Sequence, residues 1–484
     1  MKRLMRTKVV WLGDLPPDPK EFHQRDLSMV AVPDTPAVIA ECRSGARSVL
    51  VPFSPALRDS LAPLYYPVLD AGACLDVVLP NAVTQRDDRA AASSVLSTLK
   101  KAGGESLVRT LNGWALHEVA QACACHDPGR DFNPALEIDI PGNEVQPDDS
   151  QERLLRRAFS DFSRIIITPL AGSHRPGAQV WRVDGVAPDS RLYEPFVVKV
   201  GERREITVEI RTVMDYVLDR APFPHWAPLR VERSVAGATQ RLLVSMFVDR
   251  AVLLDGFLKE SSPVAAITAL FDGPLRTWRK NLRRERVQLA GVLEDQGVLP
   301  RTLANLNSIF ARAQGKGRPL RQPEALIASL KDRPQLDVLM CHAHGDLHPG
   351  NIFIRNNGLD VVLIDFASAR YERPACCDPA MLDVALGVGV VDRLPSLPEK
   401  RIRRLFERPL LPPQRFLGGL MRSDNRVRAI CQLRKQARED GATDIEYTMA
   451  VSIYLMRFAS LRPDGANASI AYEVADGLVQ TVAA

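Results

Sequence analysis

The chain has 484 residues, of which 46% are hydrophobic and 25% charged, so it is long enough for two or three domains with ordinary cores. Its net charge of +5 is too weak to indicate a nucleic-acid partner. No run of about 18 apolar residues predicts a membrane span, and eight scattered cysteines indicate reduced thiols, so we expect a cytoplasmic protein.

The first 140 residues alternate short apolar runs with helix-like patterns, which favours a parallel α/β sheet. Strands are predicted at 9–13, 28–32, 48–53 and 75–79, and helices at 56–69 and 89–102. We therefore predict a small α/β domain of flavodoxin-like or receiver-like type over residues 1–140. Asp14 follows the first predicted strand, but the third ends at Phe53-Ser54 without a carboxylate, so we expect a docking or sensing role without phosphorylation.

Residues 127–149 are rich in Asp, Pro, Gly and Asn and are predicted to form a linker, with a helix beginning near Asp149-Ser150. Strand patterns then dominate to about residue 247. Helical patterns follow, interrupted by predicted strands at 352–354 and 361–364. This order predicts a β-rich lobe over residues 150–248 and a helical lobe over residues 249–484.

Three polar side chains in the helical lobe have the spacing that phosphoryl transfer needs. Asp346 stands in a short loop, where it could accept a proton from a hydroxyl, and Asn351 offers an amide oxygen to a hard cation such as Mg²⁺. The turn Asn356-Asn357-Gly358 predicts a hairpin that returns Asp365 to the same place. We expect Asp365 to bridge Mg²⁺ to the phosphates of ATP.

A lysine in the β-rich lobe is the candidate contact for those phosphates. Lys199 lies inside the apolar run 196–200, where its amine needs an anionic partner. Glu209 follows ten residues later in the helix-like segment 205–217, and Glu205 is a second candidate for the same task. Upstream, Gly172 and Gly177 would let backbone amides of the loop 170–180 approach phosphates closely.

The pattern His344-Gly345-Asp346-x-His348-x-x-Asn351, followed by Ile364-Asp365-Phe366, resembles the aminoglycoside phosphotransferase and choline kinase branch of the protein-kinase-like superfamily. The resemblance covers roughly residues 155–470. The loop Pro169-Leu170-x-Gly172 and the strand of Lys199 are further similar to the bacterial ternary complex associated domain kinases, which are predicted parts of conflict or signalling systems.

The resemblance implies an α+β bilobal protein-kinase-like fold and the transfer of the γ-phosphoryl group of ATP to a hydroxyl. It implies that Asp346 is the catalytic base, that Asn351 and Asp365 are the metal ligands, and that Lys199 contacts phosphate with Glu209 as its partner. The expected cofactors are therefore ATP and Mg²⁺.

The same resemblance assigns two further roles. Met246, Phe247 and Val248 would form the hinge around adenine, and Asp383 would brace the catalytic loop. Gly345 stands where eukaryotic protein kinases carry the arginine that reads a phosphorylated activation loop, which counts against regulation by such phosphorylation.

Two alternative functions remain open. A nucleotide-binding regulatory module that no longer turns over would resemble the enzyme, although a decayed site usually loses one of its polar residues. A zinc hydrolase would use the histidines at 342, 344 and 348 with Asp346, although such an enzyme does not need Asn351 and Asp365. We instead expect His344 and His348 to hydrogen-bond the loop backbone.

The acceptor of the phosphoryl group is not readable from the sequence. The expected partners are ATP and a hydroxyl-bearing small molecule or protein, with a protein partner on the N-terminal domain. We expect neither a membrane nor nucleic acid as a partner.

Overall fold

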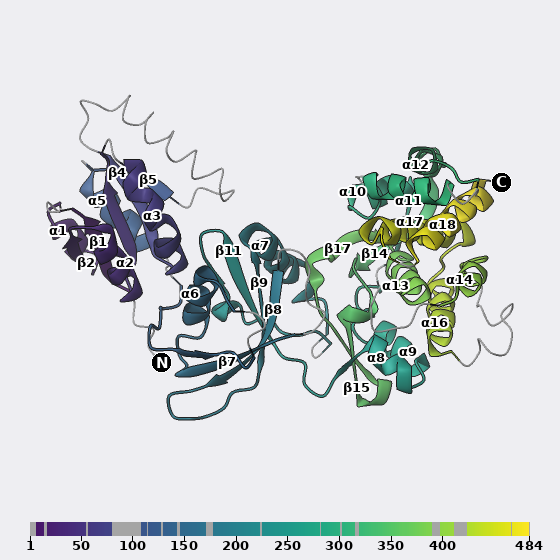
Figure 1. The fold of residues 1–484 in the computed structure, drawn as a ribbon, viewed down its shortest axis with the longest axis horizontal. Helices are drawn as coiled ribbons and strands as arrows, with labels where there is room; N and C mark the ends of the chain where they lie inside the picture. The colour runs from purple at the N-terminus through teal and green to yellow at the C-terminus, as the bar shows by residue number, and fades with distance from the viewer. Residues whose placement is uncertain are drawn as a thin grey trace. The chain divides into compact units, whose positions relative to one another are not determined.

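The computed structural model describes residues 6–13, 17–54, 57–79, 108–113, 115–126, 129–142, 146–170, 178–222, 225–280, 282–300, 303–314, 319–389, 397–410, 424–465 and 467–483. The chain divides into two compact units (Figure 1). The first unit consists of Met1–Val208 and Pro228–Phe247, and the second of Glu209–Ala227 and Val248–Ala484.

The first unit begins with a five-stranded parallel sheet in the order β2-β1-β3-β4-β5. Its strands are β1 (Lys8–Leu12), β2 (Ser28–Val32), β3 (Ser48–Pro52), β4 (Cys74–Leu79) and β5 (Val108–Asn112). Its helices are α1 (Lys20–His23), α2 (Thr35–Arg43), α3 (Leu57–Asp70) and α5 (Leu116–Cys125). The four predicted strands and the helix at 56–69 are confirmed, whereas β5 was not predicted. Asp14 and the predicted helix at 89–102 lie outside the described residues.

Each face of this sheet has its own apolar core. Helices α2 and α3 pack on one face through side chains that include Val38 and Leu64, and α1 and α5 pack on the other through Phe22 and Val119. Both faces of β3 are therefore covered, as the uninterrupted apolar sequence of this strand requires.

The rest of the first unit is a six-stranded sheet in the order β10-β11-β9-β8-β7-β6. Its strands are β6 (Glu137–Asp139), β7 (Arg164–Pro169), β8 (Ala178–Val186), β9 (Phe196–Glu202), β10 (Val235–Ala236) and β11 (Gln240–Met246). Strand β6 lies inside the predicted linker at 127–149 and pairs in parallel with β7, so the linker prediction was wrong there. The predicted helix at Asp149-Ser150 is α6 (Asp149–Ala158), which begins with a capping box of Asp148 and Gln151.

A buried carboxylate joins the two sheets of the first unit. Asp70, at the end of α3, is fully buried and pairs with Arg153 of α6 at 3.0 Å. It also accepts a hydrogen bond of 2.9 Å from the Ala238 amide, in the turn between β10 and β11. A Cβ added at Gly237 would lie 2.3 Å from an Asp70 oxygen, so this turn needs glycine for the close approach.

Helix α7 (Arg203–Thr212) follows β9 and continues directly into a π-helical turn, η2 (Val213–Val217). The end of this helical segment is anchored in the second unit. Tyr216 packs edge-on against Tyr371 with ring centroids 4.4 Å apart, and the Tyr371 hydroxyl donates to the Asp215 carbonyl oxygen at 3.1 Å. Arg220 lies over the ring of Tyr371 at 4.7 Å.

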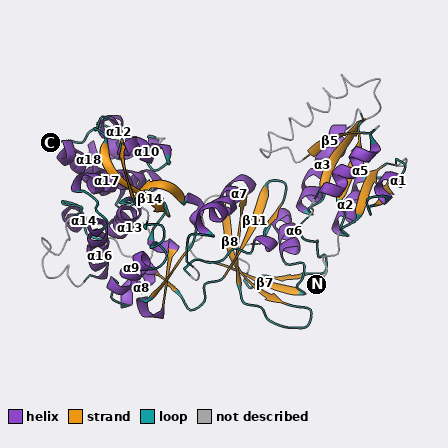
Figure 2. Cartoon of the chain, turned by 180° about the vertical axis from the view of Figure 1, so that it is seen from behind, coloured by secondary structure: helices purple, strands orange, loops and turns teal. Residues whose placement is uncertain are grey.

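The second unit is mainly helical, as Figure 2 shows. Its strands form the sheets β12-β15-β16 and β13-β14-β17, with bounds β12 (Val252–Leu253), β13 (Arg283–Val287), β14 (Leu336–Ala343), β15 (Ile352–Arg355), β16 (Asp360–Leu363) and β17 (Arg370–Pro374). Its helices are α8 (Leu254–Glu260), α9 (Val264–Asp272), α10 (Leu289–Asp295), α11 (Ala304–Gln314), α12 (Pro323–Lys331), α13 (Cys377–Val388), α14 (Glu399–Leu405), α16 (Asn425–Glu439), α17 (Asp444–Leu461) and α18 (Ala468–Ala483).

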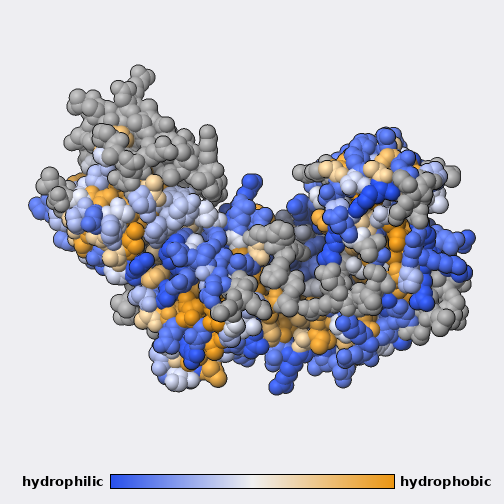
Figure 3. All heavy atoms as spheres, in the orientation of Figure 1, coloured by the Kyte–Doolittle hydropathy of each residue, from blue (hydrophilic) through white to orange (hydrophobic). Residues whose placement is uncertain are grey.

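Helix α17 is the central element of this helical body, since it packs against α11, α13 and α18. Among the described residues, no helix has the length and apolar character needed to cross a membrane. The face drawn in Figure 3 mixes hydrophilic side chains with small apolar areas. The most exposed large apolar residues of the described chain, Leu192, Leu359 and Leu461, come from three separate places in the sequence.

Candidate active site

The loop between β14 and β15 is held from behind by one buried carboxylate. The backbone amides of His344 and Gly345 donate to the two oxygens of Asp378 at 2.8 and 2.9 Å. Asp378 lies in the first turn of α13 and is 2% exposed. Two charge-assisted hydrogen bonds to one buried side chain fix the backbone just before Asp346.

The ring of His344 joins this loop to the hairpin that follows. Its Nε2 lies 3.0 Å from the Ile364 carbonyl oxygen, to which it donates, and its Nδ1 accepts from the Asp346 amide at 3.3 Å. The ring also packs on Phe366 with centroids 5.0 Å apart. The expectation that His344 hydrogen-bonds the loop backbone is confirmed.

These contacts argue against the zinc alternative. Both nitrogens of His344 are engaged with the backbone, so neither has a lone pair directed at a metal ion. His348 accepts a hydrogen bond from the Gly350 amide through Nδ1 at 3.1 Å, as expected. Across the parts of the chain that the structure describes, no three His, Cys, Asp or Glu side chains group in a way that could hold a metal.

Position 345 requires glycine, both because of its backbone conformation and because of the atoms that surround it. Its φ is +77°, and an added Cβ would lie 2.4 Å from the Ser368 carbonyl oxygen and 2.8 Å from Cζ of Arg373. An arginine at this position, as in eukaryotic protein kinases, would therefore not fit without moving the loop.

Asp346 and Asn351 are joined through the backbone of the loop. Both residues are buried, at 9% and 4% exposure. The side-chain amide nitrogen of Asn351 donates to the Asp346 carbonyl oxygen at 2.9 Å. This bond fixes the orientation of the Asn351 amide, because its nitrogen is used and its oxygen is left for another partner.

The hairpin β15–β16 carries Asp365 back to this loop. Residues Ile352 and Leu363 pair across it, and the Ile364 amide donates to the Asn351 carbonyl oxygen at 3.1 Å. Asp365 follows at once with a left-handed backbone, φ 60° and ψ 69°, which is uncommon for a residue with a side chain. The amide oxygen of Asn351 and the carboxylate of Asp365 are oxygen donors of the kind that Mg²⁺ prefers, so the residues fit that ion.

The expectation that Asp383 braces the catalytic loop was wrong. Asp383 is fully buried, but it forms a bidentate pair with Arg434 of α16 at 2.7 and 3.2 Å and accepts from the Tyr447 hydroxyl at 3.0 Å. Burial raises the pKa of Asp383, while the Arg434 charge lowers it. Asp383 therefore joins three helices of the core, and Asp378 holds the loop.

Sequence reasoning missed Arg457, which lies on α17. Its guanidinium Nη2 is 3.6 Å from Oδ1 of Asp346, while Nε2 of His348 is 3.8 Å from Oδ2. The side chain of Arg457 is 23% exposed, so it reaches the carboxylate from a partly open position. No local pattern links this arginine to a loop more than a hundred residues earlier.

Lys199 is half-buried in the middle of β9, opposite Leu243 and Val180, within the first unit. Glu209 is buried on α7, at 7% exposure, and belongs to the second unit. The Lys199–Glu209 pair stays a prediction.

The predicted hinge begins where β11 ends. Met246 is its last residue, and the Phe247 amide donates to the Pro195 carbonyl oxygen at 3.1 Å, with Arg182 over the Phe247 ring at 4.9 Å. The division between the units falls between Phe247 and Val248. Gly172 and Gly177 lie outside the described residues.

The chain is similar to several solved structures, whereas no family model and no curated protein matches it. The three described below are each named as a phosphotransferase or a kinase. The narrower resemblance to ternary complex associated domain kinases stays a prediction.

Three of these structures illustrate the similarity. An aminoglycoside phosphotransferase from Streptomyces rimosus is 16% identical, covers 58% of this chain and 96% of its own, and has a TM-score of 0.29. A type I macrolide 2′-phosphotransferase is 15% identical, covers 66% of this chain and 91% of its own, and has a TM-score of 0.31. An ethanolamine kinase from Plasmodium vivax is 10% identical, with coverages of 66% and 82% and a TM-score of 0.31.

Proposed function

We propose that this chain is an ATP- and Mg²⁺-dependent phosphotransferase that moves the γ-phosphoryl group of ATP to a hydroxyl acceptor. One observation carries the proposal: two hydrogen bonds connect the loop of Asp346 to the hairpin that ends at Asp365. The Asn351 side chain donates to the Asp346 carbonyl oxygen, and the Ile364 amide donates to the Asn351 carbonyl oxygen. Asp346, Asn351 and Asp365, the proposed base and the proposed metal ligands, thus lie on one hydrogen-bonded piece of backbone.

The roles in this proposal follow the chemistry of each side chain. Asp346 accepts the proton of the acceptor hydroxyl as that oxygen attacks the γ-phosphorus, and the bond to the leaving ADP oxygen breaks. Asn351 and Asp365 would hold the metal through oxygen atoms. When bound, MgATP supplies the transferable group and neutralises charge that develops on the phosphate oxygens. Lys199 and Glu209 keep the roles proposed from the sequence.

Arg457 enters the proposal as a positioning residue. Its guanidinium, 3.6 Å from the Asp346 carboxylate, limits the directions in which that carboxylate can point. Replacing it by alanine should lower kcat more than it raises the KM for ATP and should shift the pH–rate profile of the base. Lysine should restore part of the activity because it keeps the charge without the planar fork. An unchanged pH profile in an impaired alanine variant would contradict this role.

The N-terminal sheet supports a second, separate proposal about architecture. Its parallel order β2-β1-β3-β4-β5 is that of flavodoxin-like and receiver-like folds. We propose that residues 1–140 form such a domain before lobes at 150–248 and 249–484, and that the chain acts in a bacterial signalling or conflict system, as its resemblance implies. Ser54, which follows β3, cannot serve as a phospho-accepting carboxylate.

The decisive experiment measures nucleotide binding and turnover with the purified full chain. MgATP should raise the melting temperature, and ADP should form in the presence of a panel of hydroxyl compounds and proteins. Asp346→Asn should lower kcat by roughly 10²–10⁴-fold while MgATP still stabilises the chain. Asp365→Asn should weaken the stabilisation that depends on Mg²⁺.

A matched control separates these effects from a general loss of carboxylate charge. Asp337→Asn removes an exposed carboxylate from β14 and should leave binding and turnover unchanged. Stabilisation by MgATP without turnover of any acceptor would favour the regulatory module. Neither stabilisation nor turnover in a folded wild-type chain would refute the proposed function.

A further inference from the structure

A cavity of about 370 Å³ lies within the first unit, and none of its lining residues belongs to the proposed active site. One wall comes from the N-terminal sheet domain: the turn between α3 and β4 and the segment after α5. The other comes from the β-rich part: α6, the start of α7, and the segment before and in β10. The volume is within the range of small-molecule sites.

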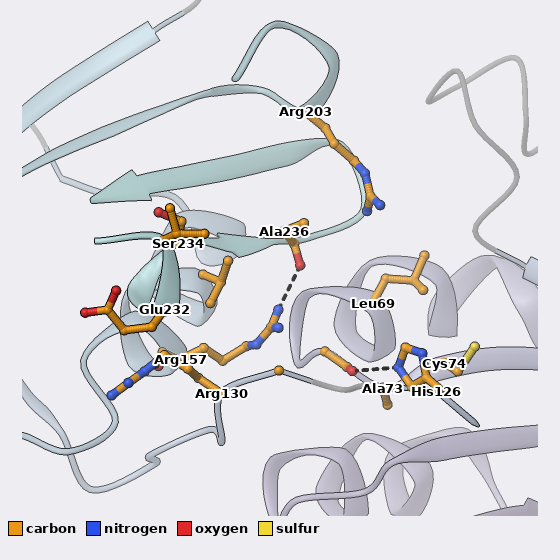
Figure 4. Close-up of a pocket in the computed structure, with 14 residues that line it drawn as sticks. Leu69, Ala73, Cys74, His126, Arg130, Arg157, Arg203, Glu232, Ser234 and Ala236 are labelled. Atoms are coloured by element: carbon orange, nitrogen blue, oxygen red, sulfur yellow. Dashed lines mark hydrogen bonds between the residues drawn. The ribbon is translucent and has the colours of Figure 1, made fainter. Parts of the chain in front are cut away.

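The polar lining of this cavity is dominated by positive charge. Three arginines and His126 face a single carboxylate, Glu232, which is itself paired with Arg230 at 2.9 Å. The three are Arg130, Arg157 and Arg203. Figure 4 shows Arg157 and Arg203 reaching toward the middle of the cavity from different elements, whereas Arg130 turns away from them.

Arg157 is built into the floor of the cavity. Its residue is 4% exposed, and its guanidinium Nη1 donates to the carbonyl oxygens of Asp70 and Ala236 at 3.0 and 2.8 Å. Gly72 makes room for it, because a Cβ there would lie 2.6 Å from Cζ of the arginine. Burial and the charge of Arg6 lower the pKa of Arg157, whereas the charge of Asp70 raises it, so a further negative charge from a ligand would add to the stabilisation that Asp70 gives.

Arg203 approaches from the first residue of α7. It is half-buried, and its Nη1 donates to the Gly237 carbonyl oxygen at 2.5 Å. A basic side chain at the start of a helix is opposed by the helix dipole, so helix stability gives no reason for its presence. An arginine guanidinium can bind two phosphate oxygens at once, so phosphate binding would explain an arginine at this position.

Apolar side chains complete the lining and suit the organic part of a ligand. Leu69 and Ala73 belong to the sheet domain, and Val231 and Val235 to the opposite wall. We propose that the cavity binds a small phosphorylated metabolite, whose phosphate contacts Arg157 and Arg203 and whose carbon skeleton lies against these apolar side chains. This site would give the N-terminal domain a small-molecule sensing function that does not depend on phosphotransfer.

Calorimetric titration of the full chain tests the proposal. The probes are inorganic phosphate, ribose 5-phosphate and adenosine monophosphate, with adenosine and succinate as compounds that lack phosphate. At least one phosphate ester should bind saturably and raise the melting temperature, whereas adenosine and succinate should not. Equal binding of succinate, or no binding of any phosphate probe, would overturn the proposal.

Variants locate the binding. Arg203→Ala should weaken phosphate-ester affinity about tenfold or more, because it removes a charge-assisted contact. Arg204→Ala, which removes the neighbouring exposed arginine outside the lining, should leave affinity unchanged. Val231→Trp adds bulk at a residue that is 42% exposed and should block the cavity if Arg203→Ala does not fold.

The active site must be separated from this cavity in the same experiment, since a nucleotide could bind at either. Asp365→Asn should leave the affinity for ribose 5-phosphate unchanged. Binding that is lost in Asp365→Asn and retained in both Arg203→Ala and Val231→Trp would place the ligand elsewhere and refute the cavity as its site.

Discussion

Asp378→Asn is the most direct test of how the loop of Asp346 is held. The substitution keeps the shape of the side chain but turns one accepting oxygen into an NH₂ group that faces a backbone N–H. One of the two bonds to His344 and Gly345, at 2.8 and 2.9 Å, must therefore be lost, and a buried amide loses its acceptor. The lost hydrogen bond to a charged acceptor and the buried amide left without a partner should together lower the free energy of opening the loop by about 2–4 kcal/mol.

Hydrogen exchange of the peptide that contains residues 340–351 measures this loss without reference to any activity. If the loop opens locally, the amides of His344 and Gly345 should exchange roughly 30–1000-fold faster in the variant. Asp383→Asn is the matched control: it changes a buried carboxylate of the same helix, and the two loop amides should keep their protection. Unchanged exchange in Asp378→Asn, or loss of protection only in Asp383→Asn, would refute the assignment.

Three further predictions concern stability. Gly345→Ala should lower the melting temperature, since the added Cβ meets the Ser368 carbonyl oxygen at 2.4 Å, and a wild-type melting curve would contradict this. Arg434→Met leaves Asp383 buried without its partner and should lower the free energy of unfolding, measured by chemical denaturation, by about 3–5 kcal/mol. The double variant Arg434→Met/Asp383→Leu should recover part of this loss, because it removes the unpaired charge. A double variant as unstable as the single one would exclude the broken pair as the cause. Burial lowers the pKa of His126, so the unfolded chain takes up its proton first as the pH falls through the ordinary value of 6.5. The resulting loss of stability is absent above pH 6.5 and complete below the lowered pKa of His126. The melting temperature of the wild type should therefore fall with pH over this range, and the melting temperature of His126→Gln should lack this contribution.

The sequence predicted the loop and the hairpin because these features are local. Asp346 and Asn351 are five residues apart, and the Asn-Gly turn defines a short hairpin that ends at Asp365. Register and turn type leave little freedom over such a distance. The positions of these three residues therefore follow from spacing alone.

The errors concern partners that only tertiary packing selects. Asp378 and Asp383 lie on the same helix, and nothing in their spacing tells which carboxylate meets the loop. Asp378 does so because it stands in the first turn, where its side chain reaches backbone amides, whereas Asp383 lies deeper and meets Arg434. The strand β6 was missed for a related reason: three residues between turn-forming segments carry no periodicity, and their pairing with β7 comes from the sheet.

The left-handed backbone of Asp365 separates folding from chemistry at this position. Glycine adopts that conformation without strain, and asparagine tolerates it as well as aspartate does. The hairpin should therefore keep its shape when the negative charge is removed, so a loss of Mg²⁺-dependent stabilisation in Asp365→Asn would report on the carboxylate and not on the fold.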